Sequence, residues 1–190
     1  MSTTSLLIGI IPLIIFVIID TFSGLKAALI AASIFAIIEA AASLYLFGEI
    51  DSVTIISVGL VLVLSAVSYI KQSSTFFKFQ PVILSTFLGG ALIVSSAISQ
   101  PLLLTLALKY KAQFPPDMQL VLESPLLQKA FEIGTLYVGI ALLFHALLTG
   151  WAAIKLNKWW WVTLRVVGFY VLTFAATLLA AFSARSQMGN

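Results

Sequence analysis

The chain has 190 residues, of which 61% are apolar and only 9% are charged, and its mean hydropathy is +1.13. Soluble domains keep about a quarter of their residues charged, so this composition excludes a water-soluble globular protein and predicts one embedded in lipid. The net charge of +3 is small and falls mainly between the apolar segments, which favours contact with anionic lipid headgroups and argues against a nucleic-acid partner.

Six apolar segments approach or exceed the length of about 20 helical residues that crosses the hydrocarbon core. They predict an all-α fold, a polytopic transmembrane helix bundle that forms a single domain over residues 1–190. The expected spans are residues 5–20, 25–47, 53–70, 81–99, 126–154 and 160–184. The first is the shortest, and Pro12 within it leaves open a tilted, kinked or partly re-entrant helix instead of a full span.

Prolines and a serine mark the predicted helix starts. Pro81, Pro101 and Pro125 each stand where a helix is expected to begin, at a first-turn position where the missing N–H costs nothing. Ser124 is a natural N-cap for the fifth span.

The connection between the fourth and fifth spans, residues 101–125, is longer than the others. Within it, residues 102–111 have the pattern of a short amphipathic helix, which the Pro-Pro-Asp sequence at 115–117 breaks before residues 118–123. Because an amphipathic helix between two spans buries its apolar face among lipid headgroups, this connection is expected to lie in the membrane interface.

Lysines and tryptophans are grouped between the fifth and sixth spans. The group consists of Lys155, Lys158, Trp159, Trp160 and Trp161. Both residue types are enriched where helix ends meet lipid headgroups, so we interpret the group as interface anchors.

Small residues form smooth faces on two of the predicted spans. They are Ala28, Ala32, Ala36 and Ala40, spaced every four positions in the second span, and Gly89 and Gly90 in the fourth. Such faces let helix backbones approach closely. Packing within the bundle is the favoured interpretation, and the contact face of a homo-oligomer is the alternative.

Ionisable residues inside apolar segments are the default indication of function, because a charge in hydrocarbon is costly. Glu39, His145, Asp20 and Arg165 are the candidates. If the second and fifth spans are neighbours, Glu39 and His145 could share a proton or a hydrogen bond. The alternatives are structural: hydroxyls or water satisfy these two groups, Arg165 extends to the headgroups, and Asp20 faces water.

No enzymatic motif is present in the sequence. It has a single histidine, no cysteine, no HExxH or G-x-S-x-G motif and no phosphate-binding glycine loop. We therefore predict no catalytic residues, no metal site and no cofactor, and a protein that is not an enzyme.

Several short stretches resemble the bacterial intracellular septation protein A family. The sequence IPLIIF at 11–16, followed by LKAALIAA at 25–32, is similar to the family's proline-leucine-phenylalanine opening and alanine-rich second helix. FFKFQPVI at 76–83 and QPLL at 100–103 resemble the entry and exit of its middle helix, and WVTLRVVG at 161–168 resembles its last-helix signature. The likeness extends over most of the chain.

The resemblance implies a multi-pass protein of the bacterial inner membrane with a non-enzymatic role in envelope maintenance, linked to septation and membrane homeostasis. Its implied partners are membrane lipids and proteins of cell division or cell-wall elongation. Two other classes stay open from the residues alone. One is a small transporter or lipid-handling protein that uses Glu39 and His145, and the other is an intramembrane lipid-modifying enzyme.

Orientation is left open by the charge pattern. Alternate connections carry two sets of basic residues: Lys26, Lys71, Lys78, Lys155 and Lys158 in one set, and Lys109, Lys111, Lys129 and Arg185 in the other. The positive-inside rule leans slightly toward termini outside the cytoplasm, whereas the family resemblance implies cytoplasmic termini. The family also has basic residues where this chain has Glu49 and Asp51, so the side of the termini is undecided.

Overall fold

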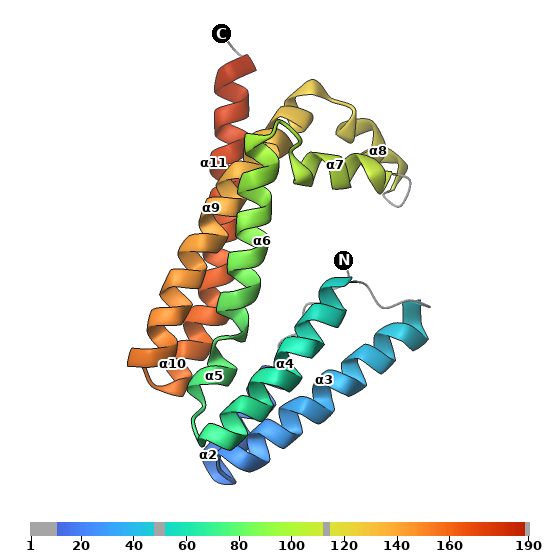
Figure 1. Ribbon diagram of the computed structural model, residues 1–190. Coiled ribbons are helices and arrows are strands. Elements are labelled where there is room, and N and C mark those ends of the chain that lie inside the picture. The colour runs from blue at the N-terminus through green and yellow to red at the C-terminus, as the bar shows by residue number, and fades with distance from the viewer. Residues whose placement is uncertain (1–10, 48–51, 112–114, 189–190) are drawn as a thin grey trace. The chain divides into compact units, whose positions relative to one another are not determined.

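The computed structural model describes residues 11–47, 52–111 and 115–188, and every regular element in these ranges is a helix (Figure 1). This confirms the all-α class. The helices are α2 (Ile11–Phe22), α3 (Leu25–Phe47), α4 (Ser52–Lys71), α5 (Thr75–Lys78), α6 (Gln80–Ala97), α7 (Leu102–Lys109), α8 (Pro116–Leu122), α9 (Pro125–Lys155), α10 (Lys158–Thr163), the π-helix η2 (Leu164–Gly168) and α11 (Phe169–Met188).

Several of these helices are long and apolar enough to cross a bilayer, so the chain is a membrane protein. Within the described residues there are four candidate spans: Leu25–Ala42, Thr75–Ala97, Pro125–Lys155 and Lys158–Met188. The apolar part of α4, Ile55–Lys71, is shorter. The first expected span, 5–20, lies partly outside the described residues, so the total of six crossings stays a prediction.

Local signals in the sequence account for the ends of the helices. The Ser124 hydroxyl accepts a hydrogen bond of 3.3 Å from the backbone N–H of Leu127, which confirms it as the N-cap of α9. The side chain of Asn157 caps α10 in the same way, accepting from the N–H groups of Trp159 and Trp160. Between α2 and α3, Gly24 has φ +83°, a backbone conformation that other residues rarely adopt.

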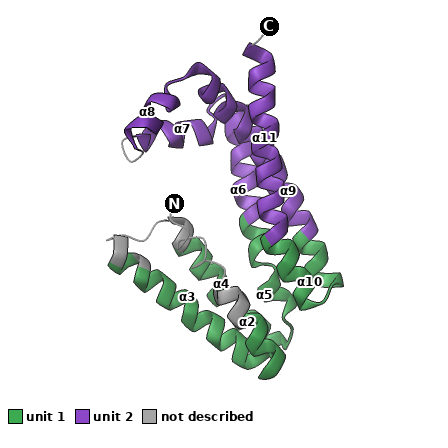
Figure 2. Cartoon of the chain, turned by 180° about the vertical axis from the view of Figure 1, so that it is seen from behind, with its two compact units in different colours: residues 1–84, 149–166 green, residues 85–148, 167–190 purple. Residues whose placement is uncertain are grey.

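The described chain forms two compact units, shown in Figure 2. Unit 1 comprises residues 1–84 and 149–166, and unit 2 comprises residues 85–148 and 167–190. Each unit takes a part of α6 and a part of α9. The single domain expected over the whole chain therefore stays a prediction.

In unit 1, α3 packs against both α2 and α4. Ala28, Ala32 and Ala36 are buried on α3, and the first two belong to a core that also contains Phe16 of α2. Phe16 in turn stacks on Phe77 of α5, with ring centroids 4.2 Å apart. The small side chains thus let α2 approach α3, while Ala40 is only half-buried.

Enlarging this alanine face should destabilise the protein. Ala32 is 3% exposed, so Ala32→Leu must push α2 away from α3 and should lower the free energy of unfolding by about 1–2 kcal/mol. Ala41→Leu, at an exposed position of the same helix, is the control and should melt like the parent. Thermal melting in detergent measures both, and equal melting temperatures would contradict the packing of this face.

In unit 2, α6 and α9 approach at two glycines. A Cβ atom added to Gly89 would lie 2.9 Å from the carbonyl oxygen of Gly139, and one added to Gly139 would lie 2.9 Å from Cγ1 of Ile93. Both positions therefore require glycine. A Cβ atom on Gly90 would meet nothing within 4 Å, so of the two glycines singled out in the sequence only Gly89 makes the close approach.

The long connection contains the expected short helix, α7, which is tied to α9, and a second helix, α8, that begins at Pro116 within the sequence predicted to be only a break. The backbone N–H of Leu103 donates to Thr135 Oγ1 at 3.3 Å, and Lys111 forms an ion pair with Glu123. The predicted location of this connection in the membrane interface stays a prediction.

Candidate functional site

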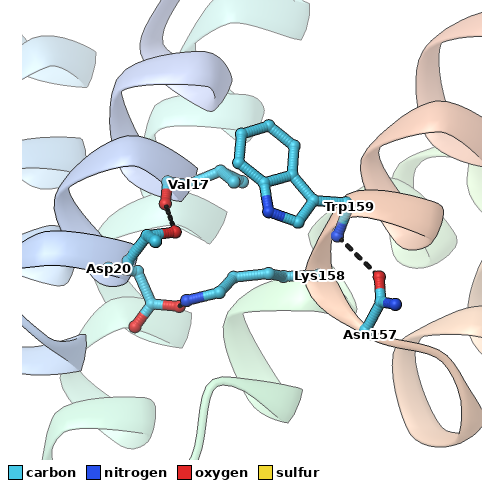
Figure 3. A network of polar contacts seen from close by, with 6 residues as sticks. Val17, Asp20, Asn157, Lys158 and Trp159 are labelled. Carbon is cyan, nitrogen blue, oxygen red and sulfur yellow. Dashed lines mark hydrogen bonds and ion pairs between the residues drawn. The ribbon is translucent and has the colours of Figure 1, made fainter.

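A cluster of charged residues in unit 1 centres on Asp20, near the end of α2. Asp20 lies near the C-terminus of α2, where the helix dipole disfavours an acid. Lys158 is the first residue of α10, at a helix N-terminus, where the dipole disfavours a cation. They neutralise each other instead. Lys158 Nζ lies 2.8 Å from Asp20 Oδ2, with side chains 28% and 15% exposed (Figure 3). The Asp20 side chain is thus largely shielded from water, in contrast to the structural alternative considered from the sequence.

A second lysine belongs to the same cluster. Lys78, the last residue of α5, is buried, and its ammonium group is attracted by Asp20 and repelled by Lys158. The Asp20 carboxylate therefore pairs directly with Lys158 and attracts Lys78 at longer range. We call Asp20, Lys78 and Lys158 the basic cluster, whose formal charge is +1.

Hydrogen bonds to α4 hold the segment that presents Lys78. The N–H of Phe77 donates to Ser68 Oγ at 2.7 Å, and the amide of Gln80 donates to Ser57 Oγ at 3.2 Å. Ser68 and Gln80 are both buried. The first turn of α5 leaves backbone N–H groups without an intrahelical partner, and Ser68 satisfies the one on Phe77, whereas Ser57 pairs with the Gln80 side chain.

The three consecutive tryptophans have different environments. Trp159 and Trp160 are exposed, as interface anchors would be, whereas Trp161 is fully buried against Ala152 and Ala153. The guanidinium carbon of Arg165 lies 5.6 Å from the centre of the Trp161 ring. Trp161 therefore differs from the expected anchor, because its indole packs in the protein core and provides a cation–π partner for Arg165.

In unit 2, His145 is buried and lies 3.2 Å from the hydroxyl of Ser85, through Nδ1. Phe169 presents its ring edge-on to the imidazole, with centroids 5.6 Å apart. A Cβ atom on Gly168, the last residue of η2, would lie 3.7 Å from the imidazole. Residues of α6, α9 and the last helix thus surround the histidine next to a π-helical turn, an irregularity common at functional sites.

Glu39, the other mid-helix candidate, is half-buried in α3. It belongs to unit 1, whereas His145 belongs to unit 2. The partnership considered from the sequence therefore stays a prediction. No group of three His, Cys, Asp or Glu side chains that could hold a metal ion occurs in the described part of the chain.

Basic residues collect at one end of unit 1. Lys26, at the start of α3, lies over the ring of Tyr69, near the end of α4, at 5.5 Å. The basic cluster joins the end of α2 to α5 and α10 in the same unit. Lys71 and Lys155 stand at the ends of α4 and α9, respectively. The lysines that the sequence assigned to one set of connections are thus helix-end residues of this unit.

Sequence reasoning missed the residues whose role depends on a distant partner. Ser85 and Gly139 have no local feature that distinguishes them from other small residues in apolar helices. Lys158 was singled out as an anchor, but its pairing with Asp20 had no sequence signal beyond opposite charge.

Comparison with known proteins gives one result. The family model of intracellular septation protein A matches residues 4–189, nearly the whole chain. No curated protein and no solved structure matches the chain. Since one family model covers the four candidate spans together with their connections, the chain belongs to the intracellular septation protein A family.

Proposed function

We propose that this protein is a non-enzymatic, multi-pass component of the bacterial inner membrane that maintains the cell envelope and supports septation. The observation that carries the proposal is the family match over residues 4–189. The role would be exerted through contacts with lipids and with proteins of the division or cell-wall elongation machinery.

The packing of the polar groups agrees with a structural role. Asp20 pairs with Lys158, and Gln80 pairs with Ser57. Buried polar groups that satisfy one another orient helices, and they need no substrate to do so. The same arrangement serves a scaffold whose surface recruits partners.

Replacing the two mid-helix candidates tests this proposal in a bacterium that lacks its own copy of the protein. Glu39→Gln and His145→Gln keep the approximate size of each side chain and remove its proton chemistry. We expect each variant, and the double variant, to restore cell length, septum frequency and growth under envelope stress to within about twofold of the parent. Melting curves in detergent verify that the variants fold.

The opposite result would identify a different class of protein. If both single variants lost function at unchanged stability, and the double variant lost no more, Glu39 and His145 would act as one coupled site. That outcome would contradict the structural role and support a proton-coupled transporter instead.

A further inference from the structure

A shallow, open groove of about 270 Å³ lies between α3 and α4 in unit 1. Ile30, Ser33 and Ile37 line it from α3, and Leu62, Ser65 and Tyr69 line it from α4. The α3 residues extend over about 10 Å along the helix axis, from the rise of 1.5 Å per residue. It is thus an elongated groove with mostly apolar walls and two serine hydroxyl groups.

One of these hydroxyls lacks a partner. Ser65 is 4% exposed, and its Oγ makes no hydrogen bond to any described residue. The Ser33 hydroxyl, by contrast, donates to the carbonyl of Leu29 at 2.9 Å. A buried hydroxyl without a partner costs free energy, so rotation of the Ser65 hydroxyl toward an acceptor in the groove would be favourable.

The mouth of the groove is basic. Tyr69 belongs to its lining, and Lys26 Nζ lies over the Tyr69 ring at 5.5 Å. Ser65 lies one helical turn from Tyr69, about 6 Å deeper along α4. From its mouth inward, the groove therefore presents a positive charge, then a hydroxyl donor and then apolar walls.

We propose that this groove binds one anionic diacyl phospholipid of the surrounding bilayer. Its phosphate lies beside Lys26, which supplies the complementary charge. An ester carbonyl, one step below the phosphate in such lipids, accepts the hydrogen bond from Ser65. One acyl chain follows the apolar walls beyond it, and the other stays in the bilayer. Lipid binding at this site can be tested independently of the proposed role in septation, because it is measured on the purified protein.

Lys26→Gln tests the charge at the mouth of the groove. The parent in phosphatidylcholine nanodiscs should retain one phosphatidylglycerol molecule in native mass spectrometry and should prefer it to phosphatidylcholine. Lys26→Gln should weaken this retention about fivefold, the factor expected for one lysine near an anionic headgroup. Lys109→Gln is the matched control, because Lys109 lies over the Tyr110 ring at the same distance of 5.5 Å but outside this groove.

Ser65→Ala tests the hydroxyl without filling the groove. It should weaken retention about two- to tenfold, the factor that corresponds to one net hydrogen bond. Because the hydroxyl has no partner among the described residues, the variant without added lipid should melt no lower than the parent. This result separates loss of the lipid from loss of the fold.

Three results would overturn the proposal. One is equal retention of phosphatidylglycerol and phosphatidylcholine by the parent. Another is equal weakening by Lys26→Gln and Lys109→Gln. The last is a second copy of the chain in the groove, seen as a dimer that persists when phosphatidylglycerol is added and that Ser65→Leu dissociates.

Discussion

Gly89→Val should destabilise this protein by about 3 kcal/mol, at the upper end of what overpacking costs. Even the first added carbon would approach the Gly139 carbonyl oxygen to 2.9 Å, and that atom belongs to the backbone of α9, which cannot rotate away. The helices must separate along their contact, which also loosens the neighbouring side chains of unit 2. Chemical unfolding in detergent, followed by circular dichroism, measures the loss.

Gly90→Val is the control, since the same atoms added one residue away enter open space. Its free energy of unfolding should stay within about 0.5 kcal/mol of the parent value, as for substitutions that break no specific contact. Gly90→Ala should even stabilise α6 by up to about 1 kcal/mol, because alanine has the higher helix propensity. Equal destabilisation by the two valine variants would show that α6 does not contact α9 at Gly89.

Asp20→Asn should lower the free energy of unfolding by about 2–3 kcal/mol, because it leaves two largely buried lysines without their shared carboxylate. Lys158→Gln should cost only about 1 kcal/mol, since Asp20 keeps its attraction to Lys78. Thermal and chemical unfolding of the two single variants and the double variant give the coupling energy.

An exposed ion pair on α9 is the control for this comparison. Lys129 and Glu132 are 3.0 Å apart, but their side chains are 34% and 49% exposed. Glu132→Gln should therefore cost no more than about 0.5 kcal/mol. If Asp20→Asn were as mild as Glu132→Gln, or milder than Lys158→Gln, the carboxylate would not be the centre of the basic cluster.

Much of the fold could be predicted because its determinants are local. The segment expected at 25–47 forms α3 with the same limits, Leu25–Phe47, because an uninterrupted apolar run must satisfy its backbone hydrogen bonds internally. Ser124 caps α9 through a contact only three residues away. The candidate sites were harder to predict, because residues that look equivalent in the sequence have different surroundings in the fold. Gly89 closely approaches α9, whereas a Cβ atom on Gly90 would meet nothing within 4 Å.

The sequence by itself determined the lipid environment, the all-helical class and most helix limits, because composition, apolar run length and capping act within a few residues of the chain. Only the tertiary structure decided which polar groups meet. Asp20 pairs with Lys158, 138 residues away, and His145 pairs with Ser85, 60 residues away. Such pairs depend on which helices pack together and how each is rotated about its axis, which are properties of distant segments acting jointly.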